Sequence, residues 1–201
     1  MVKGAFLLGE KVMPQVEKAQ GSKEAKKADL NSVLNAAKKR AEELGIRSVI
    51  VASTSGETGV KVAEMFRGYN VVVVTHSTGF TGLDVQELTP ENRERILKAG
   101  GKILTTTHAF GGLGRAVRRK FSTYQTDEIV ANTLRVFGQG TKVAVEIALM
   151  AADSGLVSVK EDVISIGGSG HGADTALVLQ PANVQDFFDV KVREIICKPW
   201  L

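Results

Sequence analysis

The chain has a single cysteine, Cys197, among its 201 residues. One thiol excludes an internal disulfide and a cysteine-based metal cluster, and it fits a reducing cytoplasm. No apolar run approaches the roughly 18 residues of a membrane-spanning helix. The first residues also lack an apolar stretch long enough for a signal peptide. We therefore expect a cytoplasmic protein that neither crosses nor binds a membrane.

Prolines are also few, at 4 against 21 glycines, so the turns depend on permissive backbone rather than on stiff linkers. The net charge of +4 is compatible with anionic small molecules but far short of a nucleic-acid-binding signature. The sequence shows no internal repeat and no break in composition. We expect one domain over residues 1–201. The oligomeric state stays open, a homo-oligomer included.

Helix-period and strand-like segments alternate along most of the chain. This order predicts an α/β domain with a largely parallel sheet covered on both faces. The last connections are too short for a helix, so at least one strand pair there is expected to be antiparallel. The predicted strands are 49–51, 71–74, 102–105, 163–166, 176–179 and 192–197, and the predicted helices are 30–44, 60–66, 90–99, 115–121, 126–137 and 143–152. Asp29 and Thr89 are the expected N-caps of the helices at 30–44 and 90–99. Residues 5–8 are either a short strand or a disordered start, and residues 15–29 are a loop or a charged lead-in.

A loop of hydroxyl and glycine residues follows the first predicted strand and precedes a helix. Unpaired backbone N–H groups and the helix dipole favour an anion at such a place, most often a phosphate. The candidate phosphate ligands are Ser53, Thr54, Ser55, Gly56, Glu57 and Thr58. The loop is neither a Walker A loop nor a dinucleotide fingerprint. The alternative is a plain helix cap by Ser53 or Thr54.

Three further loops of small or polar residues follow predicted strands. Neighbouring parallel strands bring their carboxyl-end loops together, where ligands collect. His76 can hydrogen-bond a ligand, Phe80 can stack on a planar ring, and Asp174 can accept hydrogen bonds from a ribityl or ribose group. The candidates in these loops are Thr75, His76, Thr78, Gly79, Phe80, His108, Gly167, Gly168 and Asp174. The alternatives are a polar turn, a flexible loop beside a solvated basic face (Arg115, Arg118 and Arg119), and a hairpin turn.

Glu146 stands inside an apolar run, and a carboxylate buried there must find a partner or change its pKa. We expect a structural partner, such as an arginine or backbone N–H groups, rather than a general base. No set of side chains has metal-ligand spacing, and no nucleophile elbow occurs. The sequence identifies no catalytic residue and leaves open whether any reaction is catalysed.

Residues 49–75 resemble the carboxyl-terminal domain of pyruvate kinases. The matching features are Thr54, Ser55-Gly56, Thr58, the turn Phe66 to Tyr69, and Val74-Thr75. In pyruvate kinases this loop holds a phosphate of a sugar-bisphosphate effector. The catalytic barrel of those enzymes has no counterpart in this sequence, so kinase activity is not expected.

A closer resemblance, over about residues 28–199, is to a family of free-standing proteins, mostly archaeal, that look like this domain alone. The matching segments are 51–53, 55–58, 78–80, His108, 145–147, 150–155, 172–176 and 187–189, whereas residues 1–27 depart from the family's pattern. The resemblance implies a three-layer α/β/α sandwich with a mixed, mainly parallel five-stranded sheet, and some members are associated with bound FMN.

These features lead to the hypothesis of a protein that binds a phosphorylated planar ligand, FMN by preference. The residues Ser53 to Thr58 would hold the phosphate, and the other loops would surround the ring and ribityl chain. Two alternatives remain open: a sugar-phosphate or nucleotide sensor without catalysis, and a flavin-dependent oxidoreductase.

Overall fold

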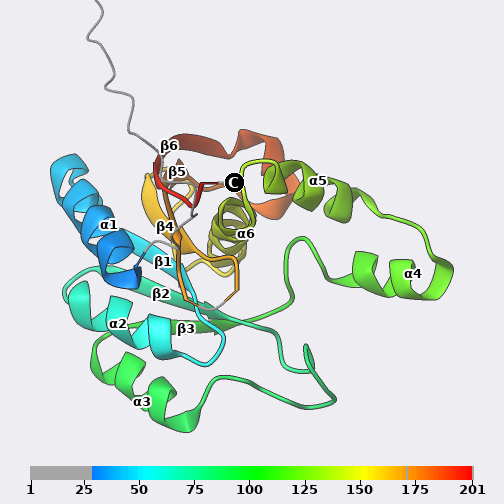
Figure 1. Ribbon diagram of the computed structural model, residues 1–201, viewed down its shortest axis with the longest axis horizontal. Helices are drawn as coiled ribbons and strands as arrows, with labels where there is room; N and C mark the ends of the chain where they lie inside the picture. Colours follow the sequence, from blue (N-terminus) through cyan, green and yellow to red (C-terminus); the bar gives the residue numbers. More distant parts are fainter. Residues whose placement is uncertain (1–28, 171, 201) are drawn as a thin grey trace, which may run out of the picture.

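The computed structural model describes residues 29–170 and 172–200. A mixed sheet lies at its centre with the strand order β3-β2-β1-β4-β5-β6 (Figure 1). Its strands are β1 (Ser48–Ala52), β2 (Asn70–Thr75), β3 (Lys102–Thr105), β4 (Val163–Gly167), β5 (Thr175–Gln180) and β6 (Lys191–Cys197). The first four run parallel to one another, and β5 is antiparallel to both of its neighbours, β4 and β6. The carboxyl ends of four parallel strands therefore meet at one edge of the sheet.

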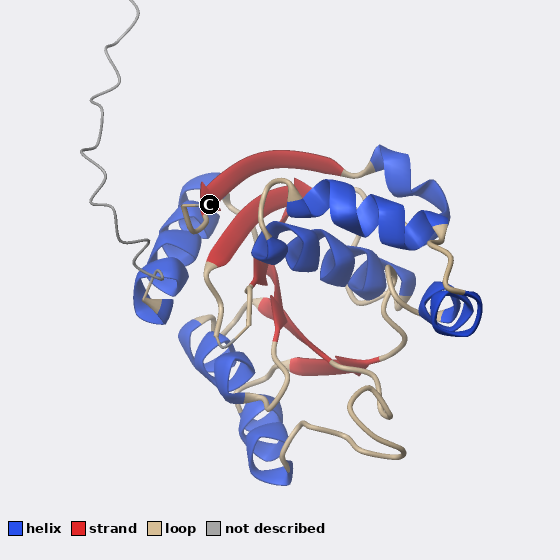
Figure 2. Ribbon diagram, turned by 45° about the vertical axis from the view of Figure 1, so that its right-hand side comes forward, coloured by secondary structure: helices blue, strands red, loops and turns tan. Residues whose placement is uncertain are grey.

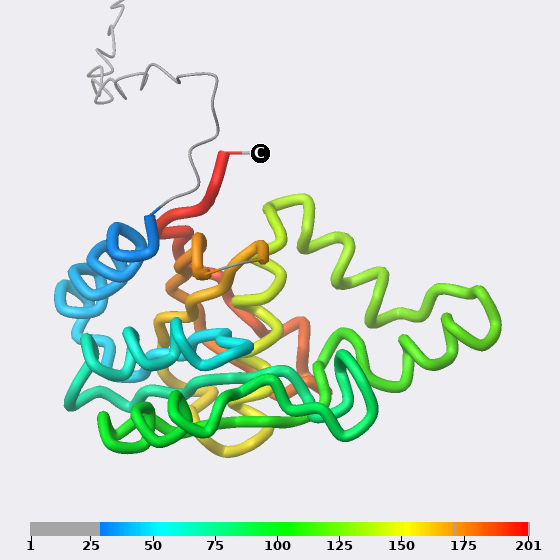
Figure 3. The backbone as a smooth tube through the Cα atoms, turned by 60° about the horizontal axis from the view of Figure 1, so that its bottom comes forward, coloured from blue at the N-terminus to red at the C-terminus, as the bar shows by residue number. Residues whose placement is uncertain are grey.

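Helices cover both faces of the sheet, which gives three layers (Figure 2). One face carries α1 (Leu30–Leu44), α2 (Glu57–Met65) and α3 (Pro90–Lys98), and the other carries α5 (Thr126–Arg135), α6 (Gln139–Asp153) and the 3-10 helix η1 (Val184–Asp189). Figure 3 shows that α4 (Leu113–Phe121) extends away from the sheet, and none of its residues is buried.

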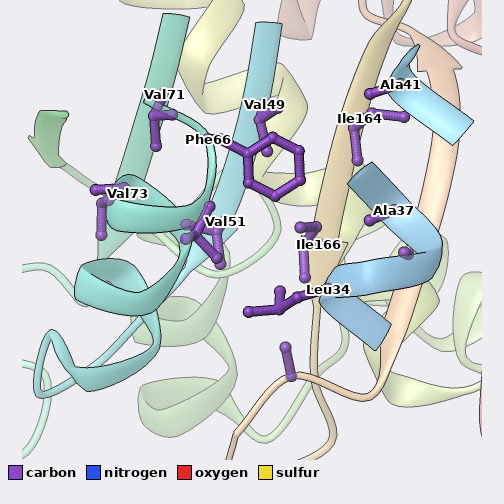
Figure 4. Packing of buried hydrophobic residues seen from close by; sticks show 14 of the residues in the cluster. Leu34, Ala37, Ala41, Val49, Val51, Phe66, Val71, Val73, Ile164 and Ile166 are labelled. Carbon is purple, nitrogen blue, oxygen red and sulfur yellow. The ribbon is translucent and has the colours of Figure 1, made fainter. Parts of the chain in front are cut away.

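The two hydrophobic cores follow from the alternation of side chains along the strands. Val49 and Val51 of β1 point to the core under α1 and α2, where Phe66 is the largest fully buried side chain (Figure 4). Ile50, between them, belongs to the opposite core under α6. The apolar residues of α6 are buried almost throughout, because this helix lies across the middle of the sheet.

The structure confirms the three-layer α/β/α fold, the mainly parallel sheet and the predicted antiparallel pairing near the carboxyl end. The implied number of five strands is wrong, because β6 adds a sixth strand at the edge beside β5. Thr89 caps α3 as the sequence indicates, accepting a hydrogen bond from the Asn92 N–H at 3.2 Å. The segments 5–8 and 15–28 lie outside the described residues.

The cap of α1 and the start of α6 are among the features that differ from expectation. Asp29 precedes α1 but makes no side-chain cap hydrogen bond. The buried helix begins at Gln139 rather than at Val143. Its extra turn contains Gly140 and Lys142, which do not belong to the apolar run at 143–152. This turn is important because it brings α6 to the edge where the parallel strands end.

Candidate functional site

A cleft of about 690 Å³ opens at the carboxyl edge of the parallel strands. Its lining comes from two sides. We call residues 53–58 and 75–80, which follow β1 and β2, the loop wall. We call the cleft-lining residues of α6 (Gln139, Lys142, Val143, Glu146, Ile147 and Met150) the helix wall. His108, Arg115 and residues 168–170 close the space between the two walls.

The loop wall begins with Ser53, whose hydroxyl acts as a helix cap. Its Oγ accepts a hydrogen bond from the Gly59 N–H at 3.0 Å, and its own N–H donates to the carbonyl of Val74 at 2.9 Å. Ser53 is 7% exposed, so both bonds are protected from water. The hydroxyl therefore satisfies a donor in the first turn of α2, although the N-cap residue is Gly56, which makes no side-chain cap bond.

The backbone of the same loop offers N–H groups to a ligand. Among the described residues, no hydrogen bond uses the N–H groups of Thr54, Ser55, Gly56 or Thr58. The loop is held from behind by α3, since the Thr89 N–H and the Asn92 Nδ2 both donate to the carbonyl of Ser55, at 3.2 and 3.0 Å. The amino end of α2 is thus a preorganised group of amide donors, with Lys61 on the next helical turn lining the same cleft.

An aromatic cluster follows along the loop wall. The ring of Phe80 lies 4.1 Å from His76 and 5.0 Å from His108 between centroids, tilted by 34° and 35°. The guanidinium of Arg115 lies 4.8 Å from the centroid of Phe80, within cation–π range. His76 is oriented from outside the cleft by Glu87, whose Oε2 lies 2.8 Å from Nδ1. These side chains form a surface suited to one face of a planar ligand.

The helix wall contains a buried ion pair, Lys142 with Glu146, one helical turn apart. Each residue is 5% exposed. The second carboxylate oxygen of Glu146 accepts the Phe110 N–H at 2.9 Å, and Lys142 Nζ lies 5.6 Å from the centroid of the Phe110 ring. The partner expected for Glu146 is therefore a backbone N–H, as predicted, together with a lysine rather than an arginine.

Burial governs the titration of the basic groups at this wall. Desolvation lowers the pKa of Lys142, although the Glu146 carboxylate acts in the opposite direction. Desolvation likewise lowers the pKa of His108, opposed by Glu146 and assisted by the cations Lys142 and Arg115 and by His76. We expect His108 to be neutral at pH 7, with one ring nitrogen able to accept a hydrogen bond.

The cleft brings together ten of the residues proposed from the sequence: Ser53, Thr54, Ser55, Glu57, Thr58, Thr75, His76, Phe80, His108 and Gly168. Thr75 is 2% exposed and its hydroxyl is 2.7 Å from that of Thr105, so its role there is structural. Gly56 lies behind the loop against Leu88 and Asn92, with φ of 97°, which favours glycine. Thr78 and Gly79 are not among the residues that line the cleft.

Gly167 and Asp174 also lie outside the cleft lining, which corrects the expectation for this loop. Gly167 is the last residue of β4 and packs against the backbone of α6 at Gly140. Asp174 is fully buried. Its carboxylate accepts hydrogen bonds from the Ser169 N–H at 3.0 Å, from the Ser169 hydroxyl, and from the Thr175 hydroxyl at 2.8 Å. With these partners it stabilises the turn and is not available to a ribityl group.

Several lining residues were missed from the sequence. Arg115 was assigned to a solvated basic face, but it stacks on Phe80. The sequence gives no indication that Lys142 and Arg135 line a site, and it predicts only a structural role for Glu146. One signal is present: Lys142 and Glu146, spaced i and i+4, are charged residues within the apolar part of α6, whose other charged residue, Asp153, lies at its exposed end. Polar groups on one stripe of a buried helix indicate that the stripe faces a polar cavity.

Two features are absent from residues 29–170 and 172–200. No three of their His, Cys, Asp and Glu side chains are grouped as metal ligands would be. None of their helices has both the length and the apolar character needed to cross a bilayer.

The family comparison assigns the fold. The sequence model described as pyruvate kinase, alpha/beta domain matches residues 31–179. The chain belongs to this family. The match covers β1 to β5 with the helices between them, and so includes both walls of the cleft. The membership shows a pyruvate kinase C-terminal-like α/β domain and leaves its ligand undetermined.

Solved structures give more distant similarities. A pyruvate kinase from Cryptosporidium parvum shares 13% identity at a TM-score of 0.37, over 76% of this chain and 23% of that one. An O-ureido-L-serine synthase shares 19% identity at a TM-score of 0.29, over 61% of this chain and 46% of that one. The chain therefore spans about a quarter of the length of that pyruvate kinase.

Proposed function

We propose that the cleft binds a phosphorylated planar small molecule, with FMN as the preferred ligand. The observation that carries this proposal is the juxtaposition of unpaired amide donors at the start of α2 with the ring cluster of His76, Phe80 and His108 in one cleft. The volume of about 690 Å³ lies within the range of small-molecule sites. The ligand is a small molecule rather than a nucleic acid or a membrane. A cytoplasmic location belongs to this proposal and depends on the single cysteine, Cys197.

The loop wall supplies what a phosphate monoester needs. The N–H groups of residues 54–56 and 58 are donors at a helix amino end, where the dipole favours negative charge. Lys61 adds a positive charge in the same cleft. Because the donors belong to the backbone, they are in position before the ligand arrives, and binding costs little reorganisation.

The ring cluster favours a flavin over a sugar phosphate. An aromatic face offers stacking to a planar ring, whereas a sugar has no such face to present. The cations beyond the cluster, Arg115 and Lys142, would lie beside the polar edge of a ring placed there. A sugar-phosphate or nucleotide sensor remains the alternative within the family, and a redox reaction would require bleaching of the bound flavin by a substrate.

The test is a titration of the full chain against FMN by flavin fluorescence quenching. Phe80→Ala should weaken binding by about threefold to tenfold, the worth of one aromatic contact. Lys61→Met should weaken it by roughly tenfold, because a charge-assisted contact to the phosphate is lost. Thr78→Ala is the matched control, since Thr78 lies in the same loop but outside the cleft lining.

A colourless preparation that does not quench added FMN would refute the flavin. If Thr78→Ala weakened binding as much as Phe80→Ala did, the assignment of the ring site to this cluster would be wrong. Thermal shifts against a panel of phosphorylated metabolites would then identify a sensor, because a ligand at 100 times its Kd adds about 2.7 kcal/mol to stability.

A further inference from the structure

Lys142 is unusual because its ammonium is buried at the cleft and only partly hydrogen-bonded. Among the described residues its single hydrogen-bond acceptor is the Glu146 carboxylate, although an ammonium has three donors. Glu146, in contrast, is also bonded by the Phe110 N–H at 2.9 Å. Lys142 is 5% exposed and lines the cleft. It is therefore a buried polar group with donors left for a ligand.

Stability alone gives no reason for such a pair. The desolvation of two buried charges offsets most of their attraction, so a well-packed apolar pair of similar size is often as stable. The charges that face Lys142 come from three helices: Glu146 on α6, which raises its pKa, and Arg135 on α5 and Arg115 on α4, which lower it. Burial is the largest influence and lowers the pKa of Lys142. The neutral amine therefore forms at a lower pH than it would for a lysine in water.

We propose that Lys142 is a nucleophilic amine that forms an imine with a phosphorylated aldehyde or ketone held in this cleft. This inference rests on the phosphate site at residues 53–58 of the proposed function, but it does not require FMN. The phosphate site would hold the phosphate, and the ring cluster would hold a planar ring that bears the carbonyl group. The carbonyl carbon then meets the amine on the helix wall.

The reaction requires only Lys142, Glu146 and the carbonyl compound. The Lys142 ammonium transfers a proton to Glu146, and the free amine attacks the carbonyl carbon, forming a C–N bond. A proton moves from nitrogen to the former carbonyl oxygen, giving a carbinolamine. Glu146 then returns its proton to the hydroxyl group, the C–O bond breaks, and water leaves. The product is a protonated imine whose positive charge remains paired with the Glu146 carboxylate. No oxidant or reductant is needed.

The test uses pyridoxal 5′-phosphate as the probe, followed by borohydride reduction and peptide mapping by mass spectrometry. The full chain should carry its main label on Lys142, although this residue is far less exposed than the surface lysines. Pyridoxal without the phosphate should label it more slowly by roughly tenfold or more, the worth of a charge-assisted hydrogen bond. Inorganic phosphate should slow the phosphorylated probe only. Glyceraldehyde 3-phosphate, a second arm, tells whether an open-chain aldehyde is also accepted.

Matched variants separate the chemistry from mere exposure. Lys142→Arg keeps the positive charge and should lose the main label, whereas Lys39→Arg, at an exposed position on α1, should keep it. Glu146→Gln should shift the pH profile of labelling to lower pH, because the carboxylate is what raises the pKa of Lys142. A shifted profile with an unchanged labelling rate on its plateau would mean that Glu146 sets the charge of Lys142 but transfers no proton.

Label distributed over exposed lysines such as Lys39, or label on Lys142 that ignores the phosphate group, would overturn the inference. These outcomes are independent of flavin binding. Quenching of FMN without an imine at Lys142 would refute this inference alone. If neither FMN binding nor labelling by pyridoxal 5′-phosphate depended on the phosphate group, the phosphate site would be refuted as well.

Discussion

The two walls of the cleft present their chemistry in opposite ways. At the start of α2 the loop wall offers backbone N–H groups, and the Ser53 side chain there is bonded to the helix and not directed at a ligand. The helix wall offers side chains, Lys142 and Glu146, which interrupt a buried apolar surface. Backbone donors tolerate many sequences, whereas a buried ion pair depends on both of its members. Substitutions should therefore affect the two walls very differently.

The largest effect is expected at the helix wall. Lys142→Met leaves the Glu146 carboxylate buried without its partner, which should cost about 3–5 kcal/mol of unfolding free energy at pH 7. Denaturant unfolding of the variant measures it. The double variant Lys142→Met with Glu146→Gln should recover most of the loss, since no charge remains buried.

The exposed pair of Arg95 and Glu64, on α3 and α2, is the control for this comparison. Its side chains are 50% and 44% exposed, and Glu64→Gln should change stability by less than about 1 kcal/mol. Equal losses at the two pairs would mean that the burial of Lys142 and Glu146 is energetically unimportant.

A smaller effect is expected at the loop wall. Ser53→Ala removes the acceptor for the Gly59 N–H and should cost about 0.5–2 kcal/mol, the range of helix-cap losses. Equilibrium unfolding again provides the measurement. Ser77→Ala, in the loop after β2, should be close to neutral. A loss at Ser53 as large as that of Lys142→Met would remove the contrast between the walls.

The smallest effect is on the pH dependence of stability, through His108. Burial lowers its folded-state pKa below the unfolded value of about 6.5. The unfolded chain therefore binds more protons below that pH, so stability falls as the pH decreases through this window and is retained above it. His108→Gln should flatten the decline between about pH 7 and pH 5, which thermal unfolding at several pH values would show. An unchanged slope would mean that His108 is protonated equally in both states.

The sequence predicts the loop wall well because its signals are local. A strand, a glycine-hydroxyl loop and a helix follow one another within residues 49–66, and each is recognisable from its neighbours. The same holds for the Thr89 cap and for the strand at residues 102–105. These features depend on a few adjacent residues and require no knowledge of the tertiary structure.

The helix wall could not be predicted in this way. Its position depends on α6 crossing the sheet and reaching the edge beside β1, a contact between residues about 90 apart in the chain. Arg115 is similar, since its stacking on Phe80 requires the loop after β2 and the start of α4 to meet. Asp174 is the opposite case, because the sequence predicts a ligand contact where the structure gives the side chain local partners. A polar residue in a glycine-rich turn has the pattern of a ligand, but its turn satisfies it locally through Ser169.

The central claim is that the two walls together hold a phosphorylated planar ligand. The most direct test is a paired fluorescence titration of the full chain with FMN and with riboflavin, which differ only in the phosphate. We expect FMN to bind at least about tenfold more tightly than riboflavin, and inorganic phosphate to compete with FMN alone. Equal affinities for the two flavins, or no binding of either, would contradict it.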